Sequence, residues 1–286
     1  MKAIPITFAP KLKESQYWLL GIGAGLIAVH LSLTWKANQP SLLGASFVFW
    51  VAISSLIWDK REKLNLQSGI VPSICGFIMI ALALLKSAFP INPGGIAHLF
   101  PIVSAFGLAL IASGFKGLKQ YRGELLALFF LAAPKLIPSS LTDLSLTTAK
   151  FSTAIMWYGG LQVFRTGVQI HLPSDSVIVN YPCSGTEQIF HLLGLAIIAL
   201  IMFPMKLWQK ILLPIVAAMI AFIVNGFRVA LMAILVDLGD KNAFDYWHMG
   251  DGSLVFSLIS VTIFGSFCLF LLSKKKKKKS PPKPVA

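Results

Sequence analysis

The sequence predicts an all-α protein that crosses a membrane several times. Of its 286 residues, 56% are hydrophobic and only 13% are charged, whereas a typical soluble domain carries about 25% charged residues. Apolar stretches close to the length of a bilayer crossing recur along the whole chain and leave no room for a sizeable soluble domain. We therefore expect one integral membrane domain over residues 1–273, followed by a basic, disordered cytoplasmic tail over residues 274–286.

About eight stretches are apolar over enough residues to be transmembrane helices. Tryptophan or tyrosine stands at several of their ends, as at Tyr17, Trp35 and Trp58, and these residue types concentrate at membrane interfaces. The expected helices are residues 17–35, 42–58, 69–85, 99–114, 124–139, 186–205, 211–236 and 254–273.

Basic residues set the expected orientation, because short cytoplasmic loops are enriched in lysine and arginine. With both termini in the cytoplasm, only seven of the 25 basic residues fall in outer segments or at outer helix ends. The net charge of +14 then reflects topology and contact of the lysine tail with anionic lipids, so we expect no nucleic-acid partner. The seven outer residues are Lys36, Lys86, Lys135, Lys150, Arg165, Arg228 and Lys241.

Two segments between the fifth and sixth apolar stretches are too polar to span. Residues 141–157 mix leucines with Thr, Asp and Ser around Lys150, which predicts a helix lying at the outer interface. Residues 162–181 alternate apolar and polar side chains on both sides of the turn-forming Pro173-Ser174-Asp175, which predicts a short β-hairpin. The hairpin belongs outside the bilayer, because an open sheet edge is not tolerated in lipid.

The hairpin leads directly into Cys183-Ser184-Gly185, just before the apolar helix expected from residue 186. Backbone N–H groups and the positive dipole end at a helix N-terminus lower the pKa of a thiol, and the same N–H groups can form part of an oxyanion hole. The alternative is a buried, inert cysteine in a turn. Cys75 and Cys268 lie inside apolar stretches, where a cysteine is usually a small buried hydrophobe.

Arg228 stands in the outer part of an otherwise apolar helix, where an arginine is costly unless it faces protein or water. Asn225 lies one turn earlier, which indicates a polar stripe facing the helix bundle. Two alternatives remain for Arg228: its side chain reaches the outer headgroups, or it pairs with Glu187, one turn beyond Cys183.

His248 lies just before the last apolar stretch, on the same side of the membrane as Cys183 and the outer part of the Arg228 helix. A lone histidine there is usually a surface residue. Thiol, imidazole and guanidinium together, however, are the parts of a cysteine acyl-transfer site. We expect no cofactor and no metal, since Cys183, His191 and His248 show no close ligand-pair spacing for zinc.

In three elements the sequence resembles the exosortase/archaeosortase family, with the cyanobacterial exosortases as a candidate branch. These are the hairpin leading to CSG at Cys183–Gly185, the NGFR at Asn225–Arg228, and His248 followed by Gly252 before the final helix. The resemblance is best over residues 157–273, the site-bearing part. Residues Thr186–Gln188 depart from the basic residue found after CSG in some relatives, which bears on the subgroup and its substrate signal.

The resemblance implies a membrane-embedded cysteine peptidase or transpeptidase of the inner membrane. Its partners would be exported, membrane-anchored proteins whose C-terminal sorting signal is processed on the outer face. Cys183 would be the nucleophile, Arg228 and His248 its catalytic partners, and Ser184, Gly185, Glu187 and Asn225 supporting residues. Two other functions remain open: a transporter or lipid-linked glycan handling protein that binds an anion through Arg228 and Glu187, and a non-enzymatic membrane assembly subunit. The sequence does not indicate an oligomeric state.

Overall fold

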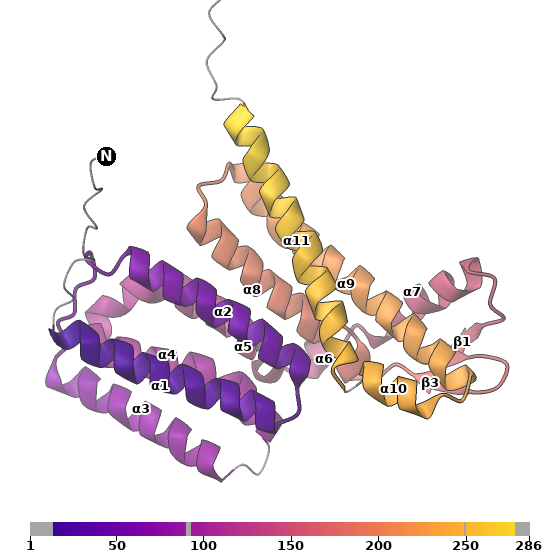
Figure 1. The fold of residues 1–286 in the computed structure, drawn as a ribbon, viewed down its shortest axis with the longest axis horizontal. Helices are drawn as coiled ribbons and strands as arrows, with labels where there is room; N and C mark the ends of the chain where they lie inside the picture. The colour runs from indigo at the N-terminus through magenta and orange to yellow at the C-terminus, as the bar shows by residue number, and fades with distance from the viewer. Residues whose placement is uncertain (1–13, 90–92, 249, 278–286) are drawn as a thin grey trace, which may run out of the picture.

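The computed structural model describes residues 14–89, 93–248 and 250–277, and within them the chain is mostly helical, with one small sheet (Figure 1). The N-terminal half forms a bundle of α1 Glu14–Lys36, α2 Pro40–Asp59, α3 Ile70–Ala88, α4 Pro93–Gly117, the 3-10 turn η1 Leu118–Tyr121, and α5 Arg122–Leu136. Between this bundle and α8 lie α6 Ser139–Thr142, α7 Ser145–Tyr158, β1 Phe164–Thr166, β2 Gln169–His171, β3 Ser176–Ile178 and the 3-10 turn η2 Tyr181–Cys183. The remaining helices are α8 Thr186–Met202, α9 Leu207–Asp237, α10 Lys241–His248 and α11 Gly252–Lys277.

The structure supports an integral multi-pass membrane protein, but not the expected count of eight crossings. Each predicted apolar stretch does contain a helix, yet only six described segments are long and apolar enough to span. The difference has two causes. Gly94–Leu136, which joins most of α4 to α5 through η1, counts as one segment, and α8 is too short by itself at 17 residues.

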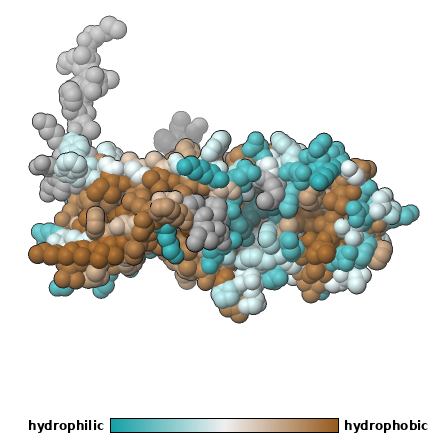
Figure 2. All heavy atoms as spheres, turned by 90° about the horizontal axis from the view of Figure 1, so that it is seen from below, coloured by the Kyte–Doolittle hydropathy of each residue, from teal (hydrophilic) through white to brown (hydrophobic). Residues whose placement is uncertain are grey.

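Large apolar side chains cover the outside of the N-terminal bundle. On α3, Ile70 is 80% exposed and Phe77 is 67% exposed. Figure 2 shows the same feature as a broad hydrophobic surface on one half of the molecule, while the other half is more polar. Such a continuous apolar surface is unusual on a soluble monomer and suits contact with lipid.

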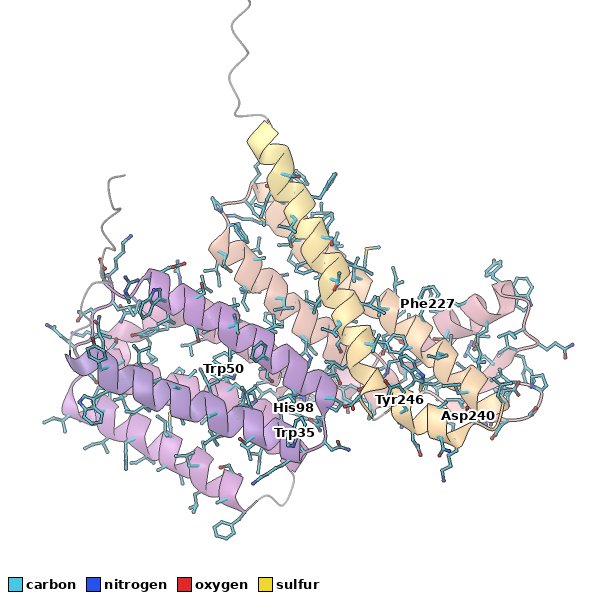
Figure 3. The ribbon with its side chains drawn as sticks, viewed as in Figure 1. Trp35, Trp50, His98, Phe227, Asp240 and Tyr246 are labelled. Carbon is cyan, nitrogen blue, oxygen red and sulfur yellow. The ribbon has the colours of Figure 1, made fainter. Side chains whose placement is uncertain are left out.

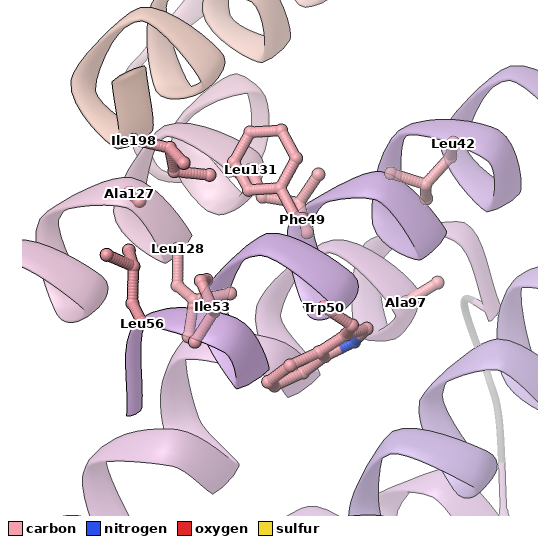
Figure 4. Close-up of a cluster of buried hydrophobic side chains, with 10 residues drawn as sticks. All are labelled: Leu42, Phe49, Trp50, Ile53, Leu56, Ala97, Ala127, Leu128, Leu131 and Ile198. Carbon is pink, nitrogen blue, oxygen red and sulfur yellow. The ribbon is translucent and has the colours of Figure 1, made fainter. Parts of the chain in front are cut away.

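The helices of the bundle are held by close packing rather than by exclusion of water, because lipid is as apolar as a leucine side chain. Figure 4 shows one buried cluster in which α2 packs against α4, α5 and α8. Phe49 at its centre is fully buried. Elsewhere, Gly76 on α3 and Gly107 on α4 let the two backbones meet, since a Cβ at Gly76 would collide with the Gly107 carbonyl.

Polar contacts tie the bundle together where α2 ends and α5 begins. Lys60 forms an ion pair with Glu124 at 2.8 Å and also donates to the carbonyl of Gln120. The Gln120 side chain in turn bonds both backbone groups of Asn65. The end of α2 is one of the basic helix ends that the charge pattern places in the cytoplasm, and this orientation stays a prediction.

The two polar segments predicted outside the bilayer adopt the predicted secondary structure. α7 is a helix, and its buried face packs against α9; its interfacial position stays a prediction. The hairpin is formed by β2 and β3, closed by a hydrogen bond from the Leu172 N–H to the Asp175 carbonyl at 2.9 Å. The structure adds β1 as a third antiparallel strand, reached through a turn in which Gly167 adopts a φ of 62°.

The end of the chain differs from the predicted boundary at residue 273. α11 continues as a helix through Lys277, so the first lysines of the basic run are helical. The rest of the predicted tail, residues 278–286, lies outside the described residues.

Candidate functional site

Cys183 is the last residue of η2, two positions before Gly185, which caps the start of α8. Its N–H donates to the carbonyl of Asn180 at 2.9 Å, which closes the 3-10 turn. Gly185 has a φ of 86°, a region that favours glycine. A Cβ at Gly185 would also lie 2.6 Å from the Asn225 side-chain nitrogen, so this position requires glycine on both grounds.

His248 meets Cys183 across 65 residues of sequence, with its Nε2 3.6 Å from the Cys183 Sγ. It ends α10, a short amphipathic helix whose start is capped by Asp240, since its carboxylate accepts the Ala243 N–H at 3.0 Å. The imidazole stacks on the ring of Phe244, one turn earlier, with centroids 4.9 Å apart. Figure 3 shows Asp240 just before α10 and Tyr246 on α10, beside the end of α9 and the start of α11.

Arg228 completes this group from α9. Its Nη2 donates to the backbone carbonyl of His248 at 2.7 Å, so the guanidinium holds the residue that carries the imidazole. Its Nε is buried and has no hydrogen-bond partner among the described residues. The alternative in which the side chain extends to the headgroups is therefore wrong, because the guanidinium points into the protein.

Each residue of the NGFR segment has its own position or contact in the structure. The Asn225 side chain donates to the carbonyl of Cys183 at 2.9 Å. Gly226 leaves room for the ring of Phe151 on α7, and its carbonyl accepts the Ser152 hydroxyl at 2.9 Å. Phe227 is 51% exposed, and Figure 3 shows its position on α9. Arg228 reaches the site, so this one turn of α9 fixes the backbone on both sides of the thiol–imidazole pair.

Ser184 does not contact the reacting groups but holds the turn that carries Cys183. It is fully buried, and its hydroxyl bonds the Thr186 hydroxyl at 2.9 Å. Its carbonyl accepts the Thr148 hydroxyl at 2.7 Å, and the Thr186 hydroxyl donates to the Thr142 carbonyl at 2.7 Å. α6 and α7 are thus bonded to the turn that carries Cys183, a connection that the sequence did not reveal.

The expected lowering of the Cys183 pKa is wrong. Burial raises the pKa of the Cys183 thiol above its usual value, and the nearby Arg228 charge offsets only part of this effect. Burial, and then the Arg228 charge, lower the pKa of His248, although Asp245 acts in the opposite direction. The resting pair is therefore a neutral thiol beside a neutral imidazole that is ready to accept its proton.

The backbone N–H groups expected at the start of α8 are largely occupied. Those of Cys183 and Ser184 bond the carbonyls of Asn180 and Tyr181, and the Thr186 N–H bonds the Ser184 hydroxyl at 3.3 Å. They are not free to form an oxyanion hole in this state. Among the described residues, the Nε–H of Arg228 is a buried side-chain donor of this group that has no hydrogen-bond partner.

Glu187 does not pair with Arg228, contrary to one expectation from the sequence. Its carboxylate lies 3.3 Å from Nε2 of His98, on α4. His191, one turn further along α8, stacks on His98 with ring centroids 6.3 Å apart. His191 therefore does not join Cys183 and His248 in a zinc site. Sequence reasoning missed His98, although the four-residue spacing of Glu187 and His191 on one helix face was visible.

The neutral pair predicts how alkylation of Cys183 depends on pH. We expect the rate of reaction with iodoacetamide to be low at pH 7 and to keep rising beyond pH 9, because the thiolate is the nucleophile and an ordinary thiol pKa is already about 8.5. Arg228→Ala should move this rise to still higher pH, since it removes the charge that favours the thiolate. The rate is measured by quenching the reaction at set times and determining the alkylated fraction of the Cys183 peptide by mass spectrometry. A plateau reached below pH 8 would indicate a preformed thiolate–imidazolium pair instead.

Comparison with known proteins identifies the family of this chain. The family model for transmembrane exosortases matches residues 35–265, which include α2 to α10 and most of α11. No curated protein and no solved structure gave a match to the chain. The matched region covers most of the 286 residues and contains Cys183, Arg228 and His248. The chain therefore belongs to the transmembrane exosortase family.

Proposed function

We propose that this protein is a membrane-embedded cysteine peptidase or transpeptidase. It processes the C-terminal sorting signals of exported, membrane-anchored proteins on the outer face of the inner membrane. The observation that carries the proposal is the approach of the Cys183 Sγ to within 3.6 Å of His248 Nε2, with Arg228 bonded to the backbone of His248. Family membership supports the substrate class.

The geometry supports a simple division of roles. Cys183 attacks the carbonyl carbon of the scissile peptide bond, and its thiol proton passes to His248 Nε2 as the S–C bond forms. The unpaired Nε–H of Arg228 stabilises the negative charge that develops on the carbonyl oxygen. His248 then returns the proton to the leaving amine, and the C–N bond breaks to leave a thioester on Cys183. Water or an acceptor amine resolves this acyl-enzyme.

The position of the site suits a substrate that is itself held in the membrane. Cys183 immediately precedes α8, Arg228 lies in the last third of α9, and His248 precedes α11. The reacting atoms therefore lie next to the ends of three apolar helices (Figure 1). A peptide segment next to a transmembrane helix of the substrate would reach Cys183 and His248 without leaving the membrane surface.

The two other functions considered from the sequence receive less support. An anion-binding transporter needs Arg228 and Glu187 to be available to its cargo. Instead, Arg228 donates to the His248 carbonyl, and Glu187 lies against His98. A purely structural assembly subunit gives no reason for a thiol and an imidazole from distant segments to meet.

Trapping the acyl-enzyme tests the proposal. Incubation of the full-length protein with a membrane-anchored substrate should give a covalent adduct on Cys183, visible as a mass increase that hydroxylamine removes, as expected of a thioester. The adduct should be missing from Cys183→Ala and form far more slowly in His248→Ala. Substrate processing without any adduct on Cys183 would refute the assigned role of the thiol.

A further inference from the structure

Three side chains that the proposed mechanism does not use meet between the N-terminal bundle and α8. They are His98 on α4, and Glu187 and His191 on α8. One possible ligand atom from each lies within 4.8 Å of the others, and His98 Nε2 is 3.3 Å from the Glu187 carboxylate. Figure 3 places His98 where the N-terminal bundle meets the site-bearing helices.

A hydrogen bond to the backbone fixes which ring nitrogen of His98 carries the proton. His98 Nδ1 lies 2.8 Å from the Gly94 carbonyl, and a carbonyl only accepts, so Nδ1 carries the proton. In a neutral ring the other nitrogen, Nε2, then presents a lone pair, and it faces the carboxylate of Glu187. One ring nitrogen of His191 lies in the same group. Among the residues that the structure describes, neither His98 Nε2 nor His191 Nε2 has a hydrogen-bond partner of good geometry.

Burial makes this arrangement costly as it stands. His98 is 1% exposed and His191 is 9% exposed, so water does not compensate for the missing partners. The chain can satisfy a buried histidine with its own groups, as His30 shows. His30 Nε2 bonds the Ala97 carbonyl at 2.8 Å, and its Nδ1 accepts the Trp50 indole N–H at 2.8 Å. Instead, the lone pair of His98 Nε2 faces the Glu187 carboxylate, with a ring nitrogen of His191 within 4.8 Å, and a cation at this position would satisfy these groups.

We propose that His98, Glu187 and His191 bind a divalent transition-metal ion of the Zn²⁺ class. Two imidazoles and one carboxylate form a known ligand set for zinc, which leaves a fourth position open. The bond from His98 Nδ1 to a backbone carbonyl is the outer contact that typically orients a metal-bound histidine. The Glu187 side chain is 41% exposed, so its carboxylate is the least enclosed of the three ligands.

The geometry needs only a small adjustment. Ligand atoms about 2.0–2.2 Å from a tetrahedral zinc ion lie about 3.4 Å apart. The His98–Glu187 separation of 3.3 Å is already close to this value, and the ligand atom of His191 lies within 4.8 Å of both other ligand atoms. The ion would join α4 to α8 one turn beyond Cys183, so it would fix the N-terminal bundle against the helix that carries the nucleophile.

Zinc binding can be measured independently of any activity. Full-length protein without a polyhistidine tag, stripped with a chelator in detergent and dialysed against micromolar Zn²⁺, should retain about one zinc per chain by elemental analysis. Co²⁺ used in its place should give visible absorption bands. His98→Ala and His191→Ala should each weaken Zn²⁺ binding at least ~10-fold, and Zn²⁺ should raise the Tm of the unmodified protein but not of these variants.

The controls separate this site from the catalytic one. Cys183→Ala, His248→Ala and the hairpin variant His171→Ala should keep the full zinc content. Glu187→Gln keeps the shape of the side chain and provides a second test if a histidine variant does not fold. The proposal is overturned if zinc is not retained stoichiometrically, which would leave a proton shared between His98 and Glu187, or if Cys183→Ala is the variant that loses it. Neither result would affect the acyl-enzyme test.

Discussion

Cys183→Ala is expected to abolish processing of a membrane-anchored substrate while leaving the protein inserted and folded. The substitution removes the nucleophile, so no acyl-enzyme can form. His248→Ala should cost ~10²–10⁴-fold in rate, because it removes the group that takes and returns the proton. Cys183→Ser should be nearly as inactive as Cys183→Ala, since a hydroxyl of similar size is far less nucleophilic at neutral pH. Gel-shift analysis of a tagged substrate in membranes measures the remaining processing.

The structure explains why the fold should survive these substitutions. The Cys183 backbone is held by Asn180 and Asn225 through its N–H and carbonyl, which the side chain does not affect. Arg228 likewise bonds the His248 carbonyl rather than its ring. Cys75→Ala is a matched control, because it removes a half-buried thiol from the middle of α3 and should process normally. Near-normal processing by Cys183→Ala would mean that the thiol is structural.

Local sequence patterns were sufficient to predict most of the fold. Apolar stretches located the helices, and the alternation around Pro173 located the β2–β3 hairpin. β1 was missed because its three residues include Arg165 and show too little alternation. The count of crossings was not confirmed, since apolar length does not show whether α4 and α5 separate into two spans at η1.

Part of the candidate site was predictable because a charged residue in an apolar helix has a high free-energy cost unless it serves a purpose, as with Arg228. The pairing of Cys183 with His248 agrees with the expectation that distant segments meet on one side of the membrane. What could not be predicted depends on packing between segments. The His98–Glu187 contact joins residues 89 positions apart, and the burial that raises the pKa of Cys183 comes from its surroundings in three dimensions.

Arg228→Ala is expected to reduce processing by ~10²–10³-fold, the usual cost of losing one donor to a developing oxyanion. The guanidinium has two functions in this structure. Its Nη2 holds the His248 backbone at 2.7 Å, while its Nε–H stays unpaired in the buried interior. Arg228→Lys should be almost as damaging, because one ammonium group cannot occupy both positions of the planar fork.

The matched control for this prediction is Arg165→Ala, which removes an arginine of the three-stranded sheet. Among the described residues, the Arg165 side chain donates to the nearby Gly167 carbonyl. It should process substrate at the normal rate. A second measurement, alkylation of Cys183, distinguishes loss of catalysis from loss of folding. A folded Arg228→Ala protein should react only at a still higher pH than the unmodified protein, because burial still raises the pKa of the thiol. An unfolded chain would expose the thiol, and its reaction would rise near the ordinary thiol pKa of about 8.5. Full activity of Arg228→Lys would show that only a positive charge is needed, and the assigned use of the Nε–H would then be wrong.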